Sequence, residues 1–353
     1  MAIIDTHKEV QKLLKENRKF HKEKEGENYP DENGFSEDYS FAQEDLDEIL
    51  SGELTPLYAT NIFDNLCIWY LDNTVYEILE HDDEKKALEH YKRATAYAYL
   101  TIALFVSERK CENGGDGGLW CDRVTELISR SLIVGWEEEY VQLNEWIIES
   151  INYGRSDTPT GGVDALFFAT GSELCKTSWF LLDLYCKAYS REYNMDNAEY
   201  TKNMTPYDKV IENWDNDNIQ EVEKSVYILC EYHIMQTEEE KKEEDYFAFN
   251  GFDYELYPYE ILSWLKLREN KGLHNPSKYT HPLMNTPIVK FFLGLEGLLD
   301  KPKTLPYVKI LVQEFKKVCP KLEMFKWLEG NDEITPNIEA LPPEDSKTFK
   351  IQI

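Results

Sequence analysis

The chain has little positive charge for its length, and this scarcity excludes several classes of protein. Among its 353 residues, 38 Lys and Arg face 67 Asp and Glu, which gives a net charge of −29. A chain this acidic repels phosphate backbones and anionic lipid surfaces, so bulk electrostatics argue against binding to nucleic acid or membrane. The charge favours a basic partner, although a halophilic or merely very soluble protein would share it.

Targeting and membrane-spanning segments are also missing from the sequence. Residues 1–10 contain Asp5, Lys8 and Glu9, and they lack the apolar core of a secretory signal. No stretch approaches the roughly 18 consecutive apolar residues of a membrane helix. The seven cysteines are an odd number without a Cys-x-x-Cys pair, which favours reduced thiols over a disulfide framework. We therefore expect a cytoplasmic protein.

Motifs of known catalytic chemistry are incomplete. There is no His-Glu-x-x-His, and the glycine-rich run at 113–118 lacks the Lys-Ser/Thr of a phosphate-binding loop. Ser107-x-x-Lys110 and Lys176-Thr177-Ser178 follow the order of a penicillin-binding serine enzyme. The second motif, however, interrupts a helical stripe, where such an enzyme requires a strand. We expect no catalytic residue, no metal site and no cofactor.

The histidines are interpreted mainly as structural. His233 closes an apolar helical stripe that begins at Ile219, a position typical of a hydrogen-bonded core histidine. His274 and His281 lie in the Pro-containing loop 270–287. An enzyme that uses this loop stays open as an alternative.

Helical periodicity dominates the sequence from Phe41 onward, and polar–apolar alternation is absent. Residues 57–79 and 88–105 predict an antiparallel helix pair, with Asp82 or Asp83 capping the second helix. Residues 5–22 predict an amphipathic helix, and residues 23–39 an exposed loop. The sequence predicts an all-α protein of two packed helical blocks with little or no sheet.

A domain boundary is predicted at residues 154–163, where Pro159, Gly161 and Gly162 stand among small polar residues. We expect an N-terminal helical domain over 1–153 and a C-terminal helical domain over 164–330. The polar residues 331–353, with three prolines, predict an extended tail.

The most distinctive stretch is 246–287. Seven Tyr and Phe residues occupy its first fourteen positions, and Pro258 and Glu260 then suit the first turn of a helix. The helical stripe that follows consists of Ile261, Trp264, Leu265 and Arg268. Among the aromatic residues, we expect Phe247, Phe249 and Trp264 to be buried, and Tyr254 and Tyr257 to be exposed.

An acidic cluster leads directly into these aromatic residues. Its carboxylates are Glu238, Glu239, Glu240, Glu243, Glu244 and Asp245. One interpretation is a solvated loop between two helices. The other is a partner-binding surface in which these carboxylates act with Tyr254 and Tyr257, because aromatic anchors rimmed by charge are typical of tight interfaces.

The same stretch resembles a known protein family. The aromatic run, the helix start Tyr257-Pro258-Tyr259-Glu260 and the later Tyr279-Thr280-His281-Pro282-Leu283 are similar to the C-terminal domain of PoNe-type immunity proteins of bacterial polymorphic toxin systems. The chain departs from that family in two places. The acidic pair that follows the helix in the family is absent here, and the family's Tyr-Pro-x-Asp-Leu reads Tyr-Thr-His-Pro-Leu in this chain. The resemblance implies structural roles for Tyr259, Glu260, Tyr279 and Pro282.

The resemblance also implies a function. A member of this family binds and neutralises a cognate toxin, here a basic DNA-degrading nuclease, and it needs no catalysis of its own. An acidic surface could occupy the basic groove that a nuclease presents to phosphate. A helical scaffold or adaptor protein without catalysis is the alternative.

Overall fold

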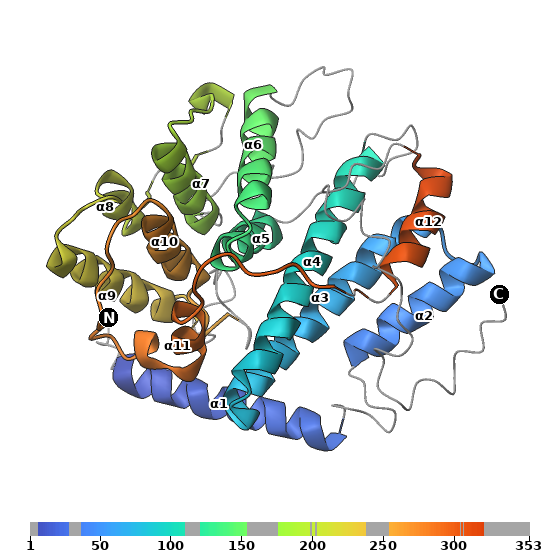
Figure 1. The fold of residues 1–353 in the computed structure, drawn as a ribbon, viewed down its shortest axis with the longest axis horizontal. Coiled ribbons are helices and arrows are strands. Elements are labelled where there is room, and N and C mark those ends of the chain that lie inside the picture. Colours follow the sequence, from blue (N-terminus) through green and yellow to red (C-terminus); the bar gives the residue numbers. More distant parts are fainter. Residues whose placement is uncertain are drawn as a thin grey trace. The chain divides into compact units, whose positions relative to one another are not determined.

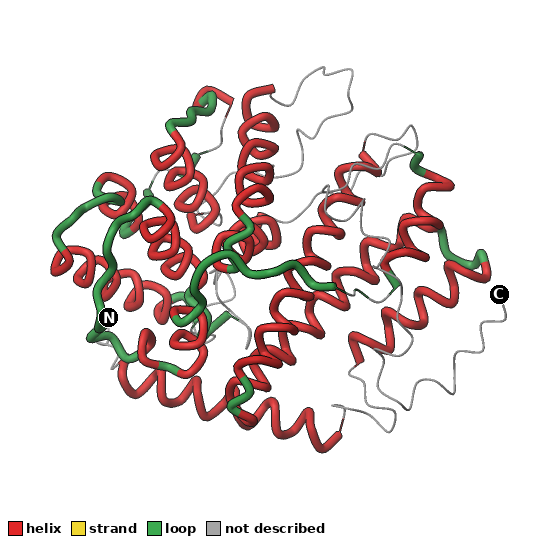
Figure 2. Tube along the Cα trace, viewed as in Figure 1, coloured by secondary structure: helices red, strands yellow, loops and turns green. Residues whose placement is uncertain are grey.

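The computed structural model describes residues 6–27, 37–109, 121–153, 176–197, 200–201, 203–237, 254–303, 305 and 307–320. Over these residues the chain forms α-helices, short helical turns and loops, and no strand (Figure 1, Figure 2). The prediction of an all-α protein is confirmed. None of the described helices combines the length and the apolarity that crossing a membrane requires.

The chain divides into two compact units, each assembled from separate stretches of sequence. One unit comprises Met1–Asn17 and Gly117–Leu299, and the other comprises Arg18–Asp116 and Asp300–Ile353. This division differs from the predicted domains 1–153 and 164–330. The predicted boundary at 154–163 and the tail at 331–353 lie outside the described residues. Glycine-rich loops mark where helices end, but they do not determine which helices pack together.

The Arg18–Asp116 unit is built on an antiparallel helix pair, α3 (Ala59–Tyr76) and α4 (Glu84–Arg109), as the sequence predicts (Figure 1). The rings of Tyr70 and Tyr97 stack between these helices, with centroids 5.6 Å apart. A π-helical turn, Glu77–His81, ends α3, and the Asp83 carboxylate then accepts a hydrogen bond from the Lys86 amide at 3.0 Å. Asp83 is therefore the cap of α4.

Other elements of this unit cover the helix pair. Helix α2 (Glu37–Ser51) packs against α3, and α12 (Val308–Val318) packs against α3 and the 3-10 turn η1 (Pro56–Tyr58). Cys319, just after α12, is disulfide-bonded. The expectation that all seven cysteines are reduced thiols therefore does not hold for Cys319.

The helices of the Gly117–Leu299 unit pack around α10 (Tyr259–Asn270). Helix α10 contacts α5 (Cys121–Ile133), α7 (Lys176–Tyr189) and α9 (Ile219–Met235). This unit also contains α6 (Glu137–Tyr153), α8 (Tyr207–Glu212), α11 (Pro287–Leu293) and the first part of α1 (Thr6–Glu27), up to Asn17. Small polar residues line the α5–α10 contact, where Ser129 donates to the Tyr259 carbonyl at 3.0 Å and accepts from Ser263 at 2.7 Å.

The turn after α5 is held by the end of the same unit. Gly135 has φ +75°, and a Cβ atom there would lie 2.7 Å from the Gly297 carbonyl oxygen. The Trp136 indole N–H donates to the Leu299 carbonyl at 3.0 Å, and the Leu299 amide donates to the Val134 carbonyl at 3.1 Å. Only glycine combines this backbone conformation with so close an approach.

Helix α1 (Thr6–Glu27) is longer than predicted. Its apolar residues Val10 and Leu13 are buried as expected, but the helix continues to Glu27, and α2 begins at Glu37. The predicted loop at 23–39 is therefore wrong at both ends. Lys and Glu are strong helix formers, so a helix can outlast its apolar stripe.

Candidate functional site

A buried histidine–glutamate pair joins α9 to α10. The apolar stripe of α9 carries His233 into the core, and the first turn of α10 carries Glu260, so that both side chains are fully buried. His233 Nδ1 lies 3.0 Å from Glu260 Oε1. His233 Nε2 lies 3.1 Å from the carbonyl oxygen of Tyr254 and 3.3 Å from that of Glu255. The interpretation of His233 as a hydrogen-bonded core histidine is confirmed.

The partners of His233 determine the direction of its hydrogen bonds. Carbonyl oxygens only accept hydrogen bonds, so His233 Nε2 donates to those of Tyr254 and Glu255. His233 Nδ1 forms the remaining hydrogen bond, to Glu260 Oε1. With both ring nitrogens engaged and no solvent access, His233 is suited to holding the chain at 254–255 rather than to acid–base chemistry.

Arg268 fixes the far end of α10 to two loops. Its guanidinium donates to the carbonyl oxygens of Trp214 at 2.7 Å, Asn216 at 2.9 Å and His274 at 2.8 Å, and to the Asn275 side chain at 3.0 Å. The sequence places Arg268 on the buried stripe of the helix, and the structure confirms that it is fully buried. These bonds order the start of the Pro-containing loop.

The Pro-containing loop is fastened to α9 at two carboxylates. Thr280 donates from its amide and its hydroxyl to Glu223, at 3.0 and 2.5 Å. His281 is buried, accepts from the Leu283 amide at Nδ1, and directs Nε2 toward Glu231 at 3.3 Å. Burial lowers the pKa of His281 to about 4 despite the neighbouring carboxylate, so the ring is neutral near pH 7.

The outward surface of α9 beside this loop carries apolar side chains among acids. Tyr227 and Ile228 are 39% and 44% exposed. The edge of the Tyr227 ring contacts His281, with centroids 5.0 Å apart, and the Glu231 carboxylate raises the pKa of Tyr227. We call this surface, made of Glu223, Tyr227, Ile228 and Glu231, the α9 face.

The α9 face was not predicted, although the sequence carries a signal for it. The buried stripe from Ile219 to His233 places positions 227 and 228 on the opposite side of the helix. A surface helix normally carries polar residues there, so a Tyr-Ile pair indicates an exposed apolar patch.

The predicted partner-binding residues have different outcomes. The acidic cluster from Glu238 to Asp245 lies outside the described residues, as do Phe247 and Phe249. Tyr254 is half-buried. The prediction that Tyr257 is exposed is wrong: it is 5% exposed, because its ring packs against Phe292 with centroids 4.5 Å apart. A ring so covered offers no surface to a partner.

The residues assigned structural roles lie within the packed part of this unit. Tyr259 is buried, and its carbonyl accepts from Ser129 as described above. Trp264 is buried as predicted, and its indole N–H donates to the Trp214 carbonyl at 3.1 Å. Tyr279 and Pro282 are half-buried in the Pro-containing loop. These positions are consistent with structural roles, which stay a prediction.

Comparison with known proteins identifies no relative: no family model, no curated protein and no solved structure matches the chain.

Proposed function

We propose that this chain is an immunity protein that binds and neutralises a cognate bacterial toxin, a basic DNA-degrading nuclease, in the cytoplasm of the producing cell. The observation that supports this proposal best is the α9 face, where exposed Tyr227 and Ile228 stand between Glu223 and Glu231. Exposed apolar side chains rimmed by charge are suited to a protein partner.

The rigidity of the α9 face supports a binding role. Glu223 and Glu231 are held by Thr280 and Thr6, whose hydroxyls donate to them at 2.5 and 2.9 Å. The buried His281 ring packs edge-to-face with the Tyr227 ring. A surface that is ordered before binding loses less conformational entropy when a partner docks.

The charge of the chain supports a basic partner. A net charge of −29 attracts a positively charged surface over long distances and accelerates encounter. A nuclease that grips DNA carries such a surface over its active groove. The same acidity would repel DNA, so this chain would bind the toxin itself and not the DNA that the toxin degrades.

The proposal is tested by protection of living cells. A candidate toxin domain is expressed in a sensitive bacterium, with and without this chain, and survival is counted. Protection together with co-purification of the two proteins is expected. Equal killing with and without the chain would overturn the proposal.

A matched pair of variants tests the α9 face itself. Ile228→Ser removes an apolar side chain from the face, and Leu298→Ser removes one that is 74% exposed elsewhere in the same unit. We expect Ile228→Ser to weaken toxin binding by roughly tenfold, the loss of about 1.4 kcal/mol. Leu298→Ser should bind like the wild type. Equal binding by both variants would place the interface elsewhere.

A further inference from the structure

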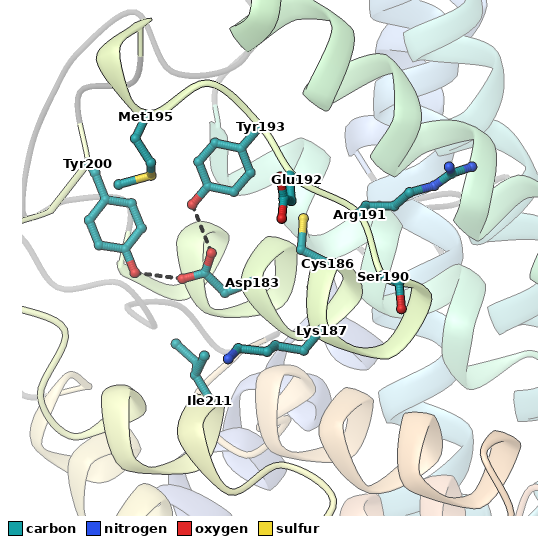
Figure 3. Close-up of a pocket in the computed structure, with 10 residues that line it drawn as sticks. All are labelled: Asp183, Cys186, Lys187, Ser190, Arg191, Glu192, Tyr193, Met195, Tyr200 and Ile211. Carbon is teal, nitrogen blue, oxygen red and sulfur yellow. Dashed lines mark hydrogen bonds between the residues drawn. The ribbon is translucent and has the colours of Figure 1, made fainter.

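A pocket opens beside the C-terminal half of α7. Its volume is about 630 Å³, and its lining includes Asp183, Tyr193, Met195, Tyr200 and Ile211 (Figure 3). The Tyr193 hydroxyl donates to Asp183 Oδ1 at 2.8 Å, and the Tyr200 hydroxyl donates to Oδ2 at 2.6 Å. The two tyrosines therefore hold the carboxylate in one orientation, directed into the pocket.

The negative charge of Asp183 is not balanced by an ion pair. Burial raises the pKa of Asp183, even though both tyrosine hydroxyls favour its ionised form. Two cations, Lys187 and Arg191, also line the pocket. Lys187 acts on Asp183 through a longer-range attraction, and Arg191 is paired with Glu145 at 2.8 Å. Within the part of the chain that the structure describes, Asp183 forms no ion pair. Asp183 is half-buried, and a carboxylate partly withdrawn from water without a counter-ion is less favourable, so a bound cation would reduce that cost.

The walls of the pocket favour an organic cation over a metal ion. The Tyr193 and Tyr200 rings pack on Trp179 with centroids 5.8 and 5.0 Å apart, and aromatic faces attract cations. Burial raises the pKa of the Cys186 thiol to about 12, so the thiol stays protonated and is a poor metal ligand. The described residues contain no group of three or more side chains that could hold a metal.

We propose that this pocket receives the guanidinium group of an arginine side chain presented by the partner protein. The source of the arginine rests on the proposed function, whereas the chemistry of the pocket does not. A carboxylate offers about four lone-pair sites, of which the tyrosines use two, so a forked donor can bind the remaining two. A planar guanidinium also stacks on tyrosine rings, which an ammonium group cannot do.

The first test uses small probes and the purified full chain. N-acetyl-arginine amide and N-acetyl-citrulline amide have nearly the same shape, but only the first is charged. Calorimetric titration should show binding of the arginine probe, and at least roughly tenfold weaker binding of the citrulline probe. Equal binding of the two probes, or no binding of the arginine probe, would overturn the proposal.

Variants connect the binding to the pocket. Asp183→Asn should weaken binding of the arginine probe by roughly tenfold, and Asp196→Asn, which removes an exposed carboxylate on the same segment, should leave it unchanged. Met195 is 52% exposed at the pocket, so Met195→Lys adds a positive charge with little risk to folding. This variant should also bind more weakly. Unchanged binding by Met195→Lys and Asp183→Asn would overturn the proposal.

Two further comparisons separate the possible origins of the ligand. Free arginine should bind no more tightly than the blocked probe, because a side chain within a protein has no free amino or carboxylate group. Tighter binding of free arginine would overturn the assignment to a protein side chain. If the arginine probe binds at Asp183 but the chain fails to protect cells, the arginine-binding pocket is supported and the immunity function is overturned. If the chain protects cells but the probe does not bind, the immunity function is supported and the arginine-binding pocket is overturned.

Discussion

His233 and Glu260 meet inside the protein with 3.0 Å between Nδ1 and Oε1, and neither side chain is exposed to solvent. Because His233 Nε2 also donates to the chain that enters α10, the pair joins α9, α10 and the preceding turn. Glu260→Ala should lower the free energy of unfolding by about 1–3 kcal/mol, since the ring nitrogen loses its partner. Urea denaturation measures this loss.

The control for this variant is Glu260→Gln. Its amide can still hydrogen-bond the ring nitrogen, so it should lose less stability than the alanine variant. An alanine variant as stable as the wild type would show that the pair does not organise this unit.

Acid should destabilise the protein through His281. Burial lowers its pKa to about 4, from an ordinary value of about 6.5 in the unfolded chain. The unfolded chain therefore binds more protons between these values, so stability is full above about pH 6.5 and falls as the pH drops toward 4. The expected loss at pH 4.5 relative to pH 7 is on the order of 2 kcal/mol.

Comparison with His281→Gln isolates this contribution. Other titrating groups, among them His90 with its pKa lowered to about 3 by burial, act in both proteins. The difference in unfolding free energy between pH 7 and pH 4.5 should therefore be smaller for the variant. Equal pH dependence of the two proteins would contradict the prediction.

Gly135 and Gly272 form a natural matched pair, because both have φ +75°. A Cβ atom at Gly272 meets nothing within 4 Å, whereas one at Gly135 meets the Gly297 carbonyl at 2.7 Å. Gly272→Ala should cost about 1–2 kcal/mol from backbone strain alone. Gly135→Ala should cost more, since Gly297 must move as well. Thermal unfolding of the two variants measures these losses. Similar losses of stability in both variants would mean that residues 297–299 can move at little energetic cost.

Arg268→Lys should be strongly destabilising although it keeps the charge. An ammonium group cannot reproduce the four hydrogen bonds to Trp214, Asn216, His274 and Asn275. We expect a loss of about 3 kcal/mol, because several buried carbonyl groups lose their donor. Arg18→Lys is the control: among the described residues, this exposed side chain forms an ion pair with Glu80 at 4.0 Å, and its replacement should cost about 0.5 kcal/mol or less. Equal melting temperatures for the two variants would contradict the prediction.

Charge should control how quickly the chain meets its toxin. Replacing the acidic cluster, Glu238, Glu239, Glu240, Glu243, Glu244 and Asp245, by Gln and Asn should leave the melting temperature unchanged or raise it. The same change should slow association, as should raising salt to physiological strength, where screening shortens to about 8 Å. Stopped-flow measurements test both. If the association rate changes neither with salt nor with these substitutions, recognition depends on shape and apolar contacts and not on charge.

The helices could be predicted from the sequence because most of them bury one face, on which the apolar residues are regularly spaced. The regularly spaced apolar residues of α5 and α6 lie in the core, as does the α9 stripe from Val222 to His233, and Gly135 lies in the turn that follows α5. Helix α4 fits a single stripe less well. Of the residues spaced as one stripe, Tyr91, Thr95 and Ile102 are buried, whereas Leu88 and Ala98 are half-buried, and Tyr97 and Leu100 on other sides of the helix are buried too. A helix covered on several sides has no single stripe to detect.

Contacts between residues far apart in the chain could not be predicted from the sequence. Periodicity indicated that His233 is buried, but its bond to Glu260 depends on how two helices meet. The burial of Tyr257 likewise depends on Phe292, which is 35 residues further along the chain. The pocket at Asp183 needs Tyr193 and Tyr200, which follow the helix in a loop without any recognisable motif.

The division of the chain into two interleaved units has a consequence for its synthesis. The α3–α4 pair leaves the ribosome early, but α12, which packs against α3, follows about 200 residues later. At a translation rate of about 5–20 residues per second, the pair waits roughly 10–40 s for α12. The opening residues, Met1–Asn17, wait in the same way for the middle of the chain. The unit that ends at Leu299 is complete before the other, whose final segment begins at Asp300, so apolar surface of the α3–α4 pair stays exposed until translation is nearly complete.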